Sequence, residues 1–272
     1  SGMARNTPLV LIVRDGWGSN PNRAHDAFNA VHLARTPIDV RLSREWPGTL
    51  VKTCGLDVGV PADQTGNSEV GHQNIGAGRI VDQEVVRISK ACDSDAIAEN
   101  DAIRGAIDAA WTNGKAVHLM GIASDAGVHG LLDHLYALLR ACKKHGAARV
   151  YIHLFMDGRD TPPFSGAGYV EQVEARCREY GVGRIASVAG RYWAMDRDFR
   201  WERVAKAYAV LTGRGECAWS ASASAAVRGY YEQPISPTQG GDEFVTPTMI
   251  GSTREEALRS RISPGDSVIF YN

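Results

Sequence analysis

The chain has 272 residues, of which 44% are hydrophobic and 22% charged, values that are ordinary for a folded protein and exclude a disordered, collagen-like or coiled-coil chain. Thirty basic and 31 acidic residues give a net charge of -1, so no overall field attracts nucleic acid or an anionic membrane, and any anion site has to be local. At about 150 residues per domain, this length predicts two domains.

The sequence contains neither a membrane span nor a secretory leader. No apolar run approaches the roughly 18 residues that a bilayer requires, and no charged start precedes an apolar segment at the N-terminus. We therefore expect a cytoplasmic protein that binds neither membrane nor nucleic acid. The five cysteines are odd in number and form no Cys-x-x-Cys pair, so we expect buried, reduced thiols at positions 54, 92, 142, 177 and 217.

The N-terminal part contains two motifs that can carry chemistry. Residues 8–13 form a short apolar run that ends at Asp15, which predicts a buried parallel strand with a carboxylate at its end. Asp15 could hold a hard cation there, or simply form an Asp turn. Ser68 stands at a predicted helix start, where backbone N–H groups and the helix dipole favour a phosphate, although taken alone it is better explained as an ordinary N-cap.

From about residue 97 the sequence alternates between helical and strand patterns. Apolar residues recur at helical spacing, each helix is followed by a glycine at 114, 146 or 181, and an apolar strand follows each glycine. Such units predict a parallel sheet with helices on both faces, after a domain boundary near residue 82. The predicted strands are 116–122, 149–155, 184–188 and 267–271. Three predicted helices end near residues 112, 142 and 180, and two more span 201–212 and 221–231.

Polar side chains follow three of these strands directly. The carboxyl ends of parallel strands form the ligand crevice of an open sheet, so these residues should meet at one edge. The cluster is made up of His129, Arg159, Arg191 and Arg197 beside Asp125, Asp157 and Asp160. Arginine binds phosphate and carboxylate with two hydrogen bonds, and a neighbouring carboxylate can take a proton. Singly, each residue is better explained by a turn or a solvated helix start, but their coincidence on one edge predicts a small anionic ligand.

Together these motifs resemble the cofactor-independent phosphoglycerate mutases over nearly the whole chain. The resemblance rests on five ordered stretches: Asp15-Gly16-Trp17-Gly18, Gly66-Asn67-Ser68-Glu69-Val70-Gly71-His72, Ser124-Asp125 with Gly127-Val128-His129, Asp157-Gly158-Arg159-Asp160-Thr161-Pro162-Pro163, and Gly190-Arg191-Tyr192 through Met195-Asp196-Arg197-Asp198. It implies an α/β protein in which residues 1–82 begin an alkaline-phosphatase-like domain and residues 83–272 form an inserted, parallel-sheet transferase domain.

The resemblance also implies the activity and the roles of the site residues. The family converts 3-phosphoglycerate to 2-phosphoglycerate in glycolysis, as an isomerase that needs no bisphosphoglycerate cofactor. Ser68 would accept the phosphoryl group as phosphoserine, Asp15 and Ser68 would ligate one of two Mn²⁺ ions (or Mg²⁺), and Asp160 would move protons. Asp160 would also hold the substrate, together with His129, Arg159, Arg191 and Arg197. Phosphoryl transfer needs this combination of positioning and charge neutralisation.

The chain departs from the family pattern in two respects. Family members are about twice as long, so the residues that complete the metal sites, a catalytic lysine and an arginine-bearing segment are missing, and we expect the 272-residue chain to be inactive alone and monomeric. Arg14 replaces the usual apolar residue and should weaken metal binding at Asp15. Two alternatives stay open: another phosphomutase or phosphatase of the same superfamily, and a non-catalytic module that binds phosphorylated acids.

Overall fold

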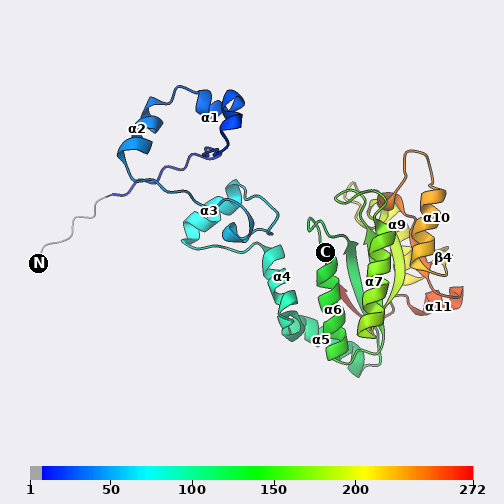
Figure 1. Cartoon of the computed structure of the whole chain (residues 1–272). Helices are drawn as coiled ribbons and strands as arrows, with labels where there is room; N and C mark the ends of the chain where they lie inside the picture. The colour runs from blue at the N-terminus through cyan, green and yellow to red at the C-terminus, as the bar shows by residue number, and fades with distance from the viewer. Residues whose placement is uncertain (1–7, 272) are drawn as a thin grey trace, which may run out of the picture. The chain divides into compact units, whose positions relative to one another are not determined.

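The computed structural model describes residues 8–271, which divide into two units, one up to Val86 and one from Arg87 (Figure 1). The boundary expected near residue 82 falls close to this division, but the assignment of the units to a phosphatase-like and a transferase domain stays a prediction. Within residues 8–271, no helix combines the length and the hydrophobicity that a bilayer span requires.

The second unit is built on a six-stranded sheet with the strand order β4-β5-β3-β2-β1-β6. The four predicted strands are confirmed and run parallel: β1 (Val117–Ala123), β2 (Val150–Met156), β3 (Arg184–Gly190) and β6 (Ser267–Phe270). Two strands that the sequence did not predict, β4 (Ala218–Ser220) and β5 (Thr248–Ile250), extend the sheet, with β5 antiparallel to β3. They have three residues each, which is too short for an alternating pattern to be recognised.

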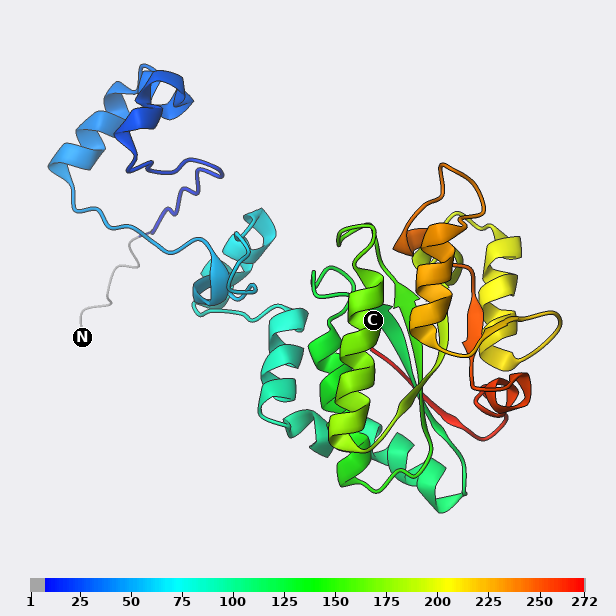
Figure 2. The same cartoon turned by 45° about the vertical axis from the view of Figure 1, so that its right-hand side comes forward.

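The predicted helices are all present. They are α5 (Asp101–Thr112), α6 (Leu132–Lys144), α7 (Gly166–Tyr180), α9 (Trp201–Thr212) and α10 (Ala223–Glu232), accompanied by α4 (Glu84–Asp93), α8 (Arg191–Ala194), α11 (Arg254–Arg259) and the 3₁₀ turns η3 (Ala96–Glu99) and η4 (Asp242–Phe244). The Asn100 side chain caps α5, and Gly181 ends α7 in the left-handed conformation. Figures 1 and 2 show α6, α7 and α10 as one layer over the sheet, and α7 contacts both of the others.

A continuous hydrophobic core joins these helices to the sheet. Leu119, Leu135, Ile152 and Leu154 have no exposed surface, and each contributes about 2 kcal/mol by its burial. Cys92, Cys142 and Cys177 are buried free thiols, as predicted.

A row of buried polar side chains crosses four neighbouring strands of the sheet. His118 Nε2 lies 3.2 Å from an Asp266 carboxylate oxygen, His118 Nδ1 lies 2.9 Å from His153 Nε2, and His153 Nδ1 lies 2.7 Å from the Ser187 hydroxyl. Because the carboxylate can only accept, each histidine donates toward Asp266 and accepts from its other neighbour. His118 and His153 are therefore satisfied core groups.

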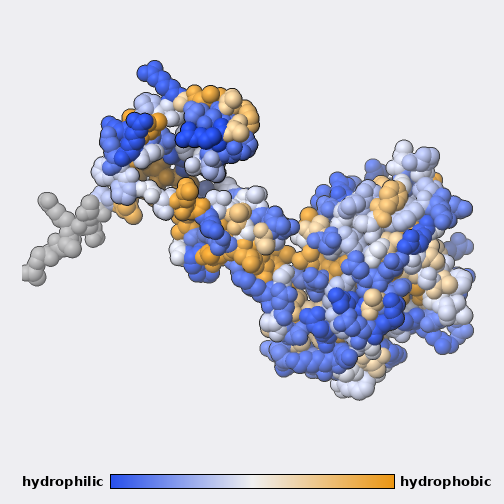
Figure 3. Space-filling model, viewed as in Figure 1, coloured by the Kyte–Doolittle hydropathy of each residue, from blue (hydrophilic) through white to orange (hydrophobic). Residues whose placement is uncertain are grey.

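The first unit holds little hydrophobic core. It contains η1 (Arg23–Phe28), α1 (Ala30–Leu33), α2 (Pro37–Glu45), η2 (Gly55–Val58) and α3 (Ser68–Ala77). Among its described hydrophobic side chains only Val60, Val70 and Val86 are buried, and Figure 3 shows apolar residues on its visible surface.

Two sequence predictions are wrong in this unit. Residues 8–13 are not a buried strand but an irregular segment, in which Leu9 is 93% and Ile12 79% exposed. A strand exists only when a neighbour pairs with its backbone, and no described segment pairs with this one. Cys54 is exposed instead of buried, because the loop before η2 has no core to enter, and Cys217 in the second unit is only half-buried.

Candidate active site

The strand register brings the predicted polar residues together at one edge of the sheet. Ala123 pairs with Met156, and Met156 pairs with Gly190, so β1, β2 and β3 end side by side. The next residues along the chain, Ser124, Asp157 and Arg191, therefore stand next to one another. β3 ends at Gly190 and α8 begins at Arg191, so the strand gives way to a helix at this point and the Arg191 side chain lies at the edge of the sheet.

Asp157 is the centre of this cluster and is fully buried. One carboxylate oxygen accepts from Arg191 at 2.6 Å and from the backbone N–H groups of Asp160 and Arg159, and the other accepts from the Ser124 hydroxyl at 2.8 Å. Burial alone would raise the pKa of Asp157, but these donors outweigh it and hold the pKa below its usual value. The carboxylate is therefore ionised and fixes the loop that carries Arg159 and Asp160.

Asp160 and His129 meet at the same place. Arg191 donates to an Asp160 carboxylate oxygen at 2.6 Å, and the same oxygen lies 3.7 Å from His129 Nε2. Burial lowers the pKa of Arg191, but its bonds to Asp160 and Asp157 raise the pKa more. Arg191 thus stays charged, although its side chain is only 11% exposed.

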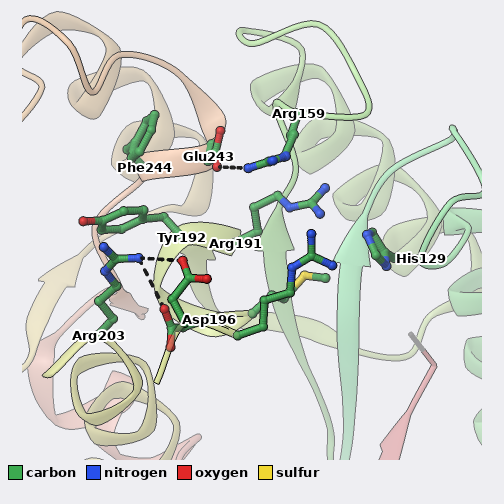
Figure 4. A pocket seen from close by; sticks show the side chains of 11 residues that line it. His129, Arg159, Arg191, Tyr192, Asp196, Arg203, Glu243 and Phe244 are labelled. Carbon is green, nitrogen blue, oxygen red and sulfur yellow. Dashed lines mark hydrogen bonds and ion pairs between the residues drawn. The ribbon is translucent and has the colours of Figure 1, made fainter. Parts of the chain in front are cut away.

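These residues border a pocket of about 350 Å³ at the carboxyl ends of the strands (Figure 4). Four residues that the sequence predicted for substrate binding line it: His129, Arg159, Arg191 and Arg197. Asp160 does not line the pocket but is bonded to Arg191 at its edge. With Arg203, the structure places five arginine or histidine side chains around one opening, an arrangement that can bind a small anion with more than one charged group.

Arg203 and Glu243, which the sequence did not single out, help to complete the wall. Asp196 accepts from Arg203 at 3.3 Å, and the Arg203 guanidinium lies 3.8 Å from the centre of the Tyr192 ring (Figure 4). Glu243, on η4, lies 3.4 Å from Arg159. Arg203 and Glu243 come long after the third strand, so only the knowledge that α9 and η4 return to this edge could have revealed them.

Arg197 differs from the other pocket arginines. Within the described part of the chain it makes no ion pair, whereas Arg159, Arg191 and Arg203 each contact a carboxylate. Asp196, the residue before Arg197, is held in place: its side chain is 1% exposed, pairs with Arg203 and accepts from the backbone N–H of Arg200. Arg197 therefore projects from a fixed loop with its charge available for a ligand.

The two remaining predicted site residues belong to the first unit. Ser68 begins α3 and is exposed; the N-cap is Asn67, whose side chain accepts from the Val70 N–H. Ser68 is therefore free of the capping role that the sequence left open. His72 Nδ1 donates to the Ser68 carbonyl at 2.7 Å, so the same nitrogen cannot also accept the Ser68 hydroxyl proton.

Asp15 lies in an exposed turn, and its neighbour Arg14 is paired with Asp39 at 2.7 Å. No group of three or more His, Cys, Asp or Glu side chains among the described residues is arranged to hold a metal ion. Asp15 and Ser68 offer two oxygen ligands, and Mn²⁺ or Mg²⁺ takes about six, so the described residues do not fit a complete metal site.

Three comparisons relate this chain to known proteins. The family model described as "BPG-independent PGAM N-terminus (iPGM_N)" matches residues 88–272. The 2,3-bisphosphoglycerate-independent phosphoglycerate mutase of Moorella thermoacetica is 51% identical over 270 residues, which are 99% of this chain and 50% of that protein. The corresponding enzyme of Rhodopirellula baltica is 48% identical over 271 residues, 98% of this chain and 49% of its own length.

The fold agrees with a solved structure as well. The crystal structure of Leishmania mexicana phosphoglycerate mutase, determined at low cobalt concentration, matches with a TM-score of 0.69 and 30% identity, covering 96% of this chain and 47% of that one. The chain thus spans about half the length of the relatives it matches. It belongs to the cofactor-independent phosphoglycerate mutase family and corresponds to the N-terminal portion of those enzymes.

Proposed function

We propose that the protein containing this chain interconverts 3-phosphoglycerate and 2-phosphoglycerate in glycolysis, without a bisphosphoglycerate cofactor. The observation that carries this proposal is the pocket at the ends of β1, β2 and β3, where His129 and four arginines converge. Phosphoglycerate is a small acid with a phosphate and a carboxylate, and arginine forks match both groups. The family membership supports the same substrate.

In this proposal the second unit binds the glycerate. Arg197, which lacks a protein partner among the described residues, and Arg159, whose side chain is 62% exposed, would take the phosphate and the carboxylate. Arg191 is held by Asp157 and Asp160, so it contributes a fixed positive charge. This preorganisation lowers the cost of ordering long side chains when the anion binds.

Asp160 would carry protons between the two hydroxyl positions of glycerate. A carboxylate that lies against Arg191 and within 3.7 Å of His129 can accept a proton from the attacking hydroxyl and return it to the departing oxygen. The same loop then serves both directions of the reaction.

Ser68 would accept the phosphoryl group. Its hydroxyl oxygen bonds to phosphorus as the bond to the glycerate oxygen breaks, and the proton that Ser68 loses is balanced by the proton that the released glycerate oxygen gains from Asp160. The glycerate turns, its other hydroxyl attacks the phosphoserine, and Ser68 regains a proton. Exposure at the start of α3, where N–H groups favour phosphate, supports this role.

The metal requirement belongs to the longer protein in this proposal. Asp15 and Ser68 would supply part of a site for one of two Mn²⁺ ions, or Mg²⁺, and residues outside this chain would complete it. Metal ions lower the barrier by neutralising charge on the transferred phosphoryl group. We therefore expect no turnover by residues 1–272 alone.

We further propose that residues 1–82 begin a metal-dependent, alkaline-phosphatase-like domain and that residues 83–272 form the inserted transferase domain. We also propose that the protein acts as a monomer in the cytoplasm. The net charge of -1 supports only the choice of ligand, because it does not attract nucleic acid or an anionic membrane and leaves small molecules as the ligands.

Binding of 3-phosphoglycerate to this chain tests the substrate site. The ³¹P resonance of the ligand should shift on addition of the chain, and Arg197→Ala should abolish most of the shift. Arg228→Ala is the matched control, because Arg228 forms an exposed pair with Glu171 outside the pocket. An unshifted resonance, or equal loss in both variants, would contradict the proposed site.

The phosphoserine step is tested in the longer protein. Brief incubation with substrate should add one phosphate to Ser68, detectable by mass spectrometry, and Ser68→Ala should abolish both the label and the mutase activity. Label that is lost only to water would indicate a phosphatase, and a chain that binds substrate without ever being labelled would indicate a binding module.

A further inference from the structure

Glu243 projects into the proposed substrate pocket from a segment far along the chain. It lies on η4, lines the pocket and places a carboxylate oxygen 3.4 Å from Arg159 (Figure 4). Its side chain is 23% exposed, whereas Arg159 is 62% exposed. The acidic group is thus the more enclosed partner of the two. It faces an opening whose other charged lining residues are His129, four arginines and two aspartates, Asp196 and Asp198, which both lie against Arg203.

Buried contacts fix η4 on the strand ends. Asp242, the preceding residue, is 1% exposed and accepts from the Gly166 N–H at 2.7 Å and from the Tyr231 hydroxyl. Its own N–H donates to the Pro163 carbonyl at 2.7 Å. On the other side the Trp193 indole donates to the Phe244 carbonyl at 3.1 Å.

Two glycines allow η4 to approach so closely. A Cβ atom at Gly190, the last residue of β3, would collide with the Glu243 carbonyl. A Cβ at Gly158, directly after Asp157, would come within 2.8 Å of the Asp242 Cβ and 2.9 Å of the Glu243 nitrogen. The backbone is therefore built to hold the Glu243 carboxylate at the edge of the anion pocket.

The charges around the pocket show what this carboxylate can do. Arg203 is paired with Asp196 and lies 4.0 Å from Asp198, and Arg191 is paired with Asp157 and Asp160. Arg159 and Arg197 are left to attract a ligand, and Glu243 offsets part of their charge. An exposed pair at 3.4 Å is weak, so an arriving anion can replace Glu243 at Arg159, but it must then lie close to a negative charge.

We propose that Glu243 is a specificity-determining residue that limits the negative charge of the acids retained by the pocket. Repulsion by one fixed carboxylate grows with the charge of the ligand. At neutral pH, 3-phosphoglycerate carries about three negative charges and 2,3-bisphosphoglycerate about five. Glu243 therefore disfavours the bisphosphorylated acid more than the monophosphorylated one. This inference rests on the proposed binding of phosphoglycerate at the same pocket.

The test compares Glu243→Gln with the wild-type chain. Glutamine keeps the shape of the side chain and removes only the charge. Dissociation constants are measured by calorimetry at low salt for inorganic phosphate, 3-phosphoglycerate and 2,3-bisphosphoglycerate. The matched control is Glu171→Gln, which removes the same charge from the exposed pair with Arg228.

We expect Glu243→Gln to bind 3-phosphoglycerate about fivefold more tightly than the wild type, the upper range for loss of an exposed pair. The gain should be larger for the bisphosphorylated acid, smaller for inorganic phosphate and reduced at about 0.5 M salt, because screening weakens exposed charges. Glu171→Gln should change none of the three constants. Glu243→Ala should give the same order of gains if the glutamine variant folds poorly.

Two results would overturn the inference while leaving the substrate site intact. Weaker or unchanged binding by both Glu243 variants would mean that the carboxylate positions Arg159 instead of competing for it. Equal gains for all three ligands would exclude discrimination by charge. If the wild-type chain binds none of the ligands, the proposed substrate site itself fails, and the inference fails with it.

Discussion

The buried row from Asp266 through His118 and His153 to Ser187 makes the second unit sensitive to acid. Desolvation, together with the neighbouring His118, lowers the pKa of His153 from 6.5 to about 3. Desolvation also lowers the pKa of His118, although Asp266 opposes this. Both histidines are thus neutral in the folded protein at neutral pH.

The size of the effect follows from proton linkage. Below pH 6.5 the unfolded chain binds a proton at His153 that the folded protein does not bind, so stability present above pH 6.5 is lost as the pH falls toward 3. At pH 5, His153 alone should cost about 2 kcal/mol, at about 1.4 kcal/mol per pH unit. Asp242 acts in the opposite direction. Burial raises its pKa to about 6, so as the pH falls the folded protein binds a proton at Asp242 before the unfolded chain does, which adds stability.

The assay isolates His153 from the other titrating groups. Urea unfolding of the wild type and of His153→Gln is followed at pH 7 and pH 5, and Leu139→Ala serves as a destabilised control without a titrating group. The variant loses hydrogen bonds at both pH values, so it unfolds more easily than the wild type at each. The difference between the two free energies of unfolding should be about 2 kcal/mol smaller at pH 5 than at pH 7, because only the wild type is destabilised by the His153 proton. The Leu139 variant should keep a constant difference. A constant difference for His153→Gln as well would refute the reasoning.

Further predictions concern the strand ends. Gly190→Ala should destabilise the second unit by about 3 kcal/mol in urea unfolding, because the added Cβ collides with the Glu243 backbone. Gly181→Ala, in open space at φ 67°, should cost only about 1–2 kcal/mol from backbone strain, and equal losses would contradict the steric account. Asp157→Ala should cost about 3–5 kcal/mol, since it removes one of the two carboxylates that pair with the buried Arg191 charge and leaves the Ser124 hydroxyl and two backbone N–H groups without their acceptor; a loss below about 1 kcal/mol would argue against Asp157 as the centre of the cluster.

The fold of the second unit could be predicted from the sequence because its elements are long and locally determined. Amphipathic helices such as α5 and α7 end at Asn113-Gly114 and at Gly181, and the buried strands between them are continuous apolar runs. β4 and β5 were missed, because strands of three residues are stabilised by the sheet they join and not by their own pattern. The strand predicted for residues 8–13 is wrong because an apolar run indicates burial but does not supply the neighbouring strand with which its backbone would have to pair.

The site was predictable to the extent that it follows strand ends. His129, Arg159 and Arg191 come within a few residues of β1, β2 and β3, so a rule about the edge of a parallel sheet finds them. Glu243 and Arg203 reach the pocket through tertiary packing of η4 and α9, which no local pattern encodes. Asp157 was visible in the sequence, but its role depends on burial and on four separate donors, which only the structure supplies.

The distribution of partners in the pocket separates residues that build it from residues that can bind. Asp157 and Arg203 are fully engaged by contacts inside the protein, and removing either would take the main ionic partner from a nearly buried charge, Arg191 or Asp196 respectively. Arg159 has one weak contact, and Arg197 makes no ion pair within the described residues. A ligand gains most from guanidinium groups that need not abandon a good partner. Binding energy should therefore concentrate on Arg197 and Arg159, while Arg191 and Asp157 set the geometry in which the two act.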